Sequence, residues 1–206
     1  MSDSPWPTIH AERHALADDL GALSDEQWQA PSQCTDWNVH QMLGHMLATA
    51  TMTPPKFLGH LARSGFSFEK MVHADVETAT AGGPTATLSS FRANADSTKS
   101  PPGPVDSWLG ETLIHSEDIR RPLGITRSYP IDAVVRTLDF YKKSNLIVGA
   151  KKRIAGLSLR ATDASWSHGE GALVEGPAMS LLLAITGRKQ ALDDLTGDGV
   201  ETLRSR

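Results

Sequence analysis

The chain has 206 residues, of which 39% are hydrophobic and 21% are charged, and its formal net charge is −4. This length favours one domain, or one domain with a small appendage, and is sufficient to bury a substantial core. The negative balance and the lack of a long basic run argue against a nucleic-acid partner. The single cysteine, Cys34, cannot form an internal disulfide, which fits a reducing compartment.

The N-terminal residues do not have the pattern of a signal peptide, because no positively charged region is followed by an apolar run. The longest apolar stretches, such as 178–186, reach about half the length of a membrane span. We therefore expect a cytoplasmic protein without a membrane partner.

Helical patterns dominate the first 150 residues. Apolar side chains recur at helical spacing over 8–23, and 24–27 has the form of a capping box. Asp36 is a suitable N-cap for a helix over 37–51, which Pro54 and Pro55 break or restart. Helices are also predicted over 56–81, ended by 82–84, and over 85–96, 105–123 and 131–148.

The character of the sequence changes after Gly149. Residues 154–163 alternate as in a strand, and 172–176 form a candidate hairpin partner. Pro177 then begins a strongly apolar helix. The patterns predict a mainly α protein, with a helical bundle over residues 1–150 and a small α/β domain over residues 151–206.

Glu111 and His115 form the most informative pair in the sequence. They are four residues apart in a predicted helix, so their side chains share one face. A carboxylate and an imidazole are both ligands for a divalent metal. A solvated helix face is the alternative, because this spacing often arises by chance. Apolar residues surround much of the helix, so this face can be buried, and a buried carboxylate needs a partner or a metal.

Two other histidines and the cysteine are also candidates for functional or structural roles. His45 shares a stripe with Met42 and Thr49, and the pattern leaves open whether it is a hydrogen-bonded core residue or a ligand. His40 lies on another face of that helix and is expected to be exposed. Cys34 stands in a loop, where we expect a structural thiol.

The sequence resembles the mycothiol-dependent maleylpyruvate isomerase family, which belongs to the DinB-like metal-binding helical bundles. Three stretches carry the resemblance: 28–47, 110–124, and parts of the tail between 161 and 188. It implies a mainly α fold, namely a DinB-like four-helix bundle with a small C-terminal α/β appendage. By position it also implies that His45, Glu111 and His115 are the metal ligands. Such a set suits zinc, or another divalent metal, and leaves a fourth position open.

The same resemblance implies a small-molecule substrate and a low-molecular-weight thiol, mycothiol, as cofactor. A metal favours the thiolate form of a thiol, which would add to an unsaturated or electrophilic substrate. Isomerase and thiol S-transferase both fit this chemistry. A metal-retaining small-molecule binding or stress-response protein of the same fold stays open, as does a ligand-binding regulator. The chain could be a monomer or a homodimer.

Two further residues are candidates for supporting roles. Asp118 could accept a hydrogen bond from a ligand histidine or could pair with Arg121. Arg188 could bind a substrate carboxylate as a catalytic residue, and a surface arginine is the alternative.

Overall fold

A computed structural model describes residues 4–34, 36–145 and 148–206. The protein is mainly α-helical and has one small sheet, as the sequence predicts. The chain divides into two compact units, Met1–Arg127 and Ser128–Arg206. This division lies earlier in the chain than the predicted boundary at residue 150.

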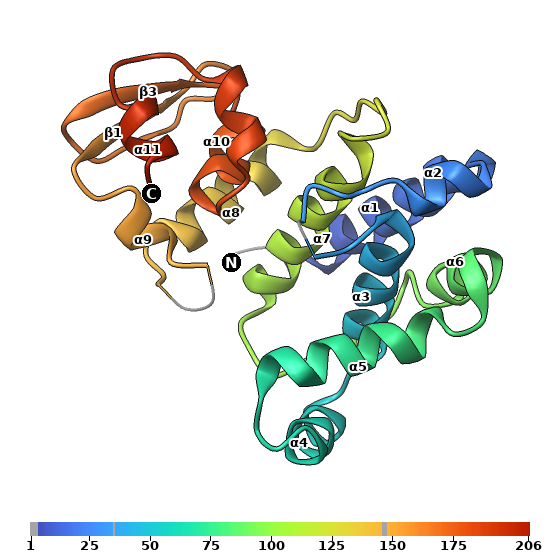
Figure 1. Cartoon of the computed structure of the whole chain (residues 1–206). Helices are drawn as coiled ribbons and strands as arrows, with labels where there is room; N and C mark the ends of the chain where they lie inside the picture. The colour runs from blue at the N-terminus through green and yellow to red at the C-terminus, as the bar shows by residue number, and fades with distance from the viewer. Residues whose placement is uncertain (1–3, 35, 146–147) are drawn as a thin grey trace. The chain divides into compact units, whose positions relative to one another are not determined.

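The described residues of the first unit form helices and connecting loops, with no strand (Figure 1). The central helix α3 packs against α5, α6 and α7, and α1 packs against α6 and α7. The bounds of its helices are α1 Trp6–Asp19, α2 Asp25–Gln29, α3 Val39–Thr51, α4 Pro54–Arg63, α5 Phe68–Thr80, α6 Gly83–Ala93 and α7 Val105–Arg120.

Capping boxes fix where two of these helices begin. Ser24 accepts a hydrogen bond from the backbone of Gln27 and caps α2, as predicted. The cap of α3 is Asn38, so the prediction of Asp36 is wrong. Asn38 accepts from the backbone N–H of Gln41, whose side chain accepts from the N–H of Asn38, and this reciprocal pair satisfies two otherwise unpaired donors.

The segment predicted as one helix over 56–81 is two helices. Gly65 and Phe66 both adopt left-handed backbone conformations, with φ of 64° and 60°, and these interrupt the helical path between α4 and α5. The predicted stop at 82–84 instead begins α6, in which Pro84 occupies the first turn, where its missing N–H costs no hydrogen bond.

The core of the first unit gathers apolar side chains from its helices. Phe91 of α6 is fully buried in this cluster. The cluster comprises Leu16, Ala17, Leu20, Trp28, Val39, Met42, Leu43, Met46, Leu47, Leu88, Phe91 and Ile119.

The second unit contains α8 Ile131–Tyr141, α9 Ala150–Arg153, α10 Ala178–Ile185, α11 Val200–Arg204 and the strands β1 Leu157–Ala161, β2 Ser167–His168 and β3 Ala172–Gly176. The strand order is β2-β1-β3. Helix α8 packs on α10, which also contacts β1 and β3. This packing places α8 in the second unit and explains why the division precedes residue 150.

The strand pairing differs from the predicted hairpin. Strand β3 pairs with β1 in parallel, with Leu159 opposite Val174, whereas the short strand β2 pairs with β1 in antiparallel fashion. The turn-rich segment between β1 and β3 therefore contains β2, after which the chain crosses from one side of β1 to the other to reach β3. Within the described residues, no helix has both the length and the apolar character needed to cross a membrane.

Candidate metal centre

Helix α7 carries Glu111 and His115 on one face, as predicted. Glu111 is buried, with 8% of its surface exposed, and His115 is half-buried. Burial raises the pKa of Glu111, and this rise is opposed by the charges of His115 and Arg13 and by hydrogen bonds from Thr112 and Thr49. The carboxyl group therefore lies in a low-dielectric interior where a cation would stabilise its charged form.

Helix α3 brings His45 to this face. The ring centroids of His45 and His115 are 5.0 Å apart, with the planes at 88°. The indole ring of Trp37 packs against His45, and the two ring centroids are 4.9 Å apart. Packing of α3 on α7 thus joins two imidazoles whose positions are 70 residues apart in the sequence.

The orientation of His115 is fixed by a buried carboxylate. Its Nδ1 lies 2.8 Å from Oδ2 of Asp118, whose side chain is fully buried. This contact leaves Nε2 as the nitrogen that could serve as a metal ligand. Arg121, the other predicted partner of Asp118, donates from Nε to Glu117 at 2.9 Å.

The fit of this site to a metal can be tested on its polar atoms. Among the described residues, no set of three or more His, Cys, Asp or Glu side chains is grouped closely enough to hold a metal ion. One buried oxygen, Oε1 of Glu111, nevertheless has no hydrogen-bond partner in the described part of the chain. A buried unpaired carboxylate oxygen beside two imidazoles is the donor chemistry that zinc uses. The residue types therefore suit a metal, but in this structure the described side chains are not grouped closely enough to hold one.

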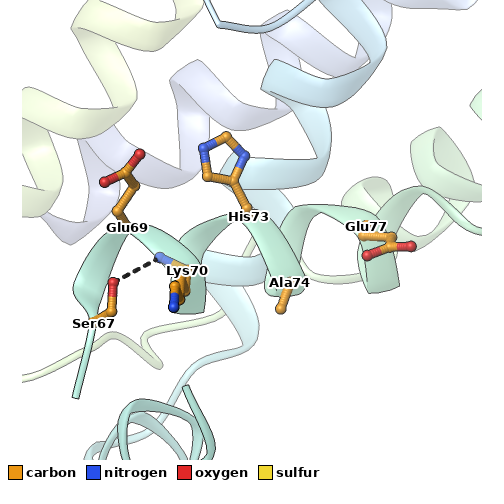
Figure 2. A pocket seen from close by; sticks show the side chains of 6 residues that line it. All are labelled: Ser67, Glu69, Lys70, His73, Ala74 and Glu77. Atoms are coloured by element: carbon orange, nitrogen blue, oxygen red, sulfur yellow. Dashed lines mark hydrogen bonds between the residues drawn. The ribbon is translucent and has the colours of Figure 1, made fainter. Parts of the chain in front are cut away.

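A pocket on α5 adjoins these aromatic rings through His73. His73 lies on the outer part of α5, and its ring centroid is 5.9 Å from Trp37. The pocket has a volume of about 370 Å³, and Figure 2 shows Glu69 and His73 pointing to the same side of the helix. Its lining residues are Ser67, Glu69, Lys70, His73, Ala74 and Glu77.

His40 is buried, so the prediction that it is exposed is wrong. Helix α6 packs over that face of α3, and His40 Nε2 lies 2.9 Å from Oγ1 of Thr87. Burial lowers its pKa, and a hydrogen bond to the backbone of Gly83 opposes this effect. His40 is therefore a hydrogen-bonded core histidine. Cys34 is half-buried at the edge of the core cluster.

Arg188 lies in the second unit, after α10. It is half-buried and donates from Nη1 to the backbone oxygen of Thr186 at 3.1 Å. Its charge lowers the pKa of the neighbouring Arg153, although burial is the larger cause of that shift. Its predicted role as a carboxylate-binding residue stays a prediction.

One charged residue near the site was not predicted. Arg13 of α1 is buried, with 1% exposed, and interacts electrostatically with Glu111. It stands in the apolar stripe of α1, between Ile9 and Leu16, with a spacing of four and three residues. A charged residue inside an apolar stripe is the signal that could have identified it.

The first unit has the fold of a DinB-like helical bundle, as predicted. Residues 9–101 match the family model described as Mycothiol maleylpyruvate isomerase N-terminal domain. No curated protein matches the sequence.

Two solved structures are similar to the whole chain. One is a crystal structure of the mycothiol-dependent maleylpyruvate isomerase, with 16% identity and a TM-score of 0.64. The other is a histidine-to-alanine mutant of that isomerase, with 15% identity and a TM-score of 0.63. Each comparison covers 94% of this chain and 91% of the other. At these identities the structures establish the fold.

The predicted resemblance to the mycothiol-dependent maleylpyruvate isomerase family is therefore confirmed, and residues 9–101 carry its N-terminal domain. This relationship supports the expectation that the protein is an enzyme.

Proposed function

We propose that this protein is a zinc-dependent enzyme that uses mycothiol to isomerise a small unsaturated acid. His45, Glu111 and His115 would hold the metal. The single observation that supports this most strongly is the contact between the two imidazole rings, 5.0 Å apart, beside a buried carboxylate with an unpartnered oxygen. The match of residues 9–101 to the family provides independent support.

A bound zinc ion would supply Lewis-acid stabilisation of a thiolate at neutral pH. The chain's own residues prepare the site for this. Asp118 holds the His115 ring through Nδ1, which leaves Nε2 as the nitrogen that would bind a metal. Trp37 packs on His45 and limits the rotation of that ring. The buried surroundings of Glu111 exclude water and strengthen its attraction to a cation.

The α5 pocket is a candidate for the thiol or substrate. It adjoins the same aromatic rings through His73, and it contains the cationic side chain of Lys70. Arg188 is retained as a second cationic candidate, with binding of a substrate carboxylate as its proposed role.

Metal analysis of the purified protein tests the proposal first. We expect about one equivalent of zinc per chain, and its loss in His45→Ala and His115→Ala. Carefully prepared wild-type protein that contains and binds no divalent metal would refute zinc dependence.

A thiol assay tests the chemistry separately. Mycothiol would be titrated against a panel of cis-unsaturated acids and electrophiles, with product and thiol both quantified. A trans product without thiol consumption would support the isomerase, whereas stoichiometric thiol consumption would indicate an S-transferase. Metal binding without any thiol-dependent reaction would favour a small-molecule binding protein of the same fold.

A further inference from the structure

Several charged side chains are buried where α1 packs on α7, and some of them form ion pairs. Glu12 of α1 accepts two hydrogen bonds from Arg127, from Nε and Nη2, each at 3.0 Å. Asp19 of α1 accepts from Nε of Arg120 at 2.7 Å. These pairs neutralise charges that would be costly to bury alone.

Arg13 differs from its neighbours in this contact. Its Nη1 donates to the backbone oxygen of Ser97 at 3.0 Å. Its Nε and Nη2 are both buried and have no hydrogen-bond partner among the described residues. The charge of Glu111 acts on Arg13, and Oε1 of Glu111 also has no hydrogen-bond partner among the described residues.

The two unpartnered nitrogens of Arg13 are the pair that binds a carboxylate side-on. Nε–H and one Nη2–H point in parallel, so they match the two oxygens of a carboxylate. Arg127 uses the same two nitrogens for Glu12 within this protein. Arg13 therefore offers the donor arrangement of a bidentate carboxylate contact.

The position of Arg13 relates this donor pair to the candidate metal centre. The charges of His115 and of Arg13 both act on Glu111, and α1 packs directly on α7, so Arg13 lies near the candidate metal centre. An anionic ligand beside Arg13 would lie next to the proposed metal ligands. A water molecule could satisfy one donor, but it would leave the buried charge uncompensated.

We propose that Arg13 is a carboxylate-binding residue of this site, which anchors an anionic small molecule through Nε and Nη2 beside Glu111. The location of the reacting group relative to this anchor rests on the proposed function, whereas binding of the carboxylate does not.

Binding of maleate tests the proposal, with its neutral diamide as the uncharged counterpart. Titration calorimetry would be performed on wild type, Arg13→Gln, Arg13→Lys and His115→Ala. We expect maleate affinity to fall about tenfold or more in Arg13→Gln, since a charged hydrogen-bonded pair is lost. Arg13→Lys should be intermediate, because a lysine keeps the charge without the parallel donors. The weaker binding of the diamide should be similar in wild type and both Arg13 variants.

The matched control is Arg92→Gln, which removes an exposed arginine that donates to the backbone of α1, at Ala17. It should leave maleate affinity unchanged. Folding is monitored by urea denaturation, in which Arg13→Gln should unfold at no lower urea concentration than wild type, because an unpaired buried charge is removed. Maleate should raise the thermal midpoint of wild type and have no such effect on Arg13→Gln.

Three outcomes would overturn the inference. The first is that folded Arg13→Gln binds maleate with wild-type affinity, and the second is that wild type does not bind maleate. The third is that binding is lost in His115→Ala but not in Arg13→Gln, which would place the anion on the metal. If no zinc is found but Arg13→Gln still loses maleate, the inference stands and zinc dependence fails. A variant that does not fold is replaced by Arg13→Lys, for which unchanged affinity and an unchanged thermal response would equally overturn it.

Discussion

Removal of the Asp118 carboxylate should weaken metal binding without removing a ligand. Asp118 is fully buried and its Oδ2 lies 2.8 Å from Nδ1 of His115. Such a contact fixes the ring and raises the basicity of the opposite nitrogen. Loss of an outer partner of this kind costs about 10–100-fold in metal affinity, and this equals ~1.4–2.7 kcal/mol. A hydrogen bond to a charged group contributes ~1.5–3 kcal/mol, which gives the same range.

The assay is competition for zinc between the protein and a chromogenic chelator. Asp118→Ala should show the full loss, and Asp118→Asn a smaller one, because the amide oxygen still accepts a hydrogen bond but carries no charge. The matched control is Glu117→Gln, which alters the adjacent carboxylate on α7, paired with Arg121. Wild-type zinc affinity in Asp118→Ala would refute the reasoning, as would an equal loss in Glu117→Gln.

Three further predictions concern the fold. Phe91→Ala should lower the free energy of unfolding by ~3–5 kcal/mol, because it opens a cavity in the first unit's core. A free energy of unfolding within about 1 kcal/mol of wild type, from urea denaturation, would contradict this. Arg127→Ala should cost ~3–5 kcal/mol by leaving the carboxylate of Glu12 buried without its partner, and the additional change Glu12→Gln should recover part of that loss. Burial lowers the pKa of His40, so the unfolded chain takes up this proton at a higher pH than the folded chain. The free energy of unfolding should therefore fall as the pH drops below about 6.5, the ordinary value of histidine; His40→Gln should reduce this dependence, and an identical pH profile in the variant would contradict the assignment.

Local patterns predicted the helices where the signals were short-range and strong. The capping box over 24–27 and the helix containing Glu111 and His115 depend on residues within one or two turns of each other. The errors arose where several signals competed. Asp36 and Asn38 are both good caps, and only the reciprocal bond to Gln41 decides between them.

The strand pairing and the exposure of His40 could not be predicted in this way. Alternation indicates a strand but carries no information about the direction of its partner, so β3 was expected to form a hairpin. Similarly, the position of His40 on α3 does not reveal that α6, more than 40 residues later, covers it. Both features depend on contacts between segments distant in the sequence.

By itself, the sequence determined that this is a mainly helical protein, because helical periodicity and capping are local properties, and its resemblance to a family supplied the three candidate metal ligands as a prediction. The tertiary structure alone decided three points. Packing of α3 on α7 brings His45 to His115, burial leaves Oε1 of Glu111 unpartnered, and packing of α1 on α7 places the unmatched guanidinium of Arg13 beside that carboxylate. The physical reason is that burial and convergence depend on which faces of distant helices meet, and no pattern within a single helix specifies this.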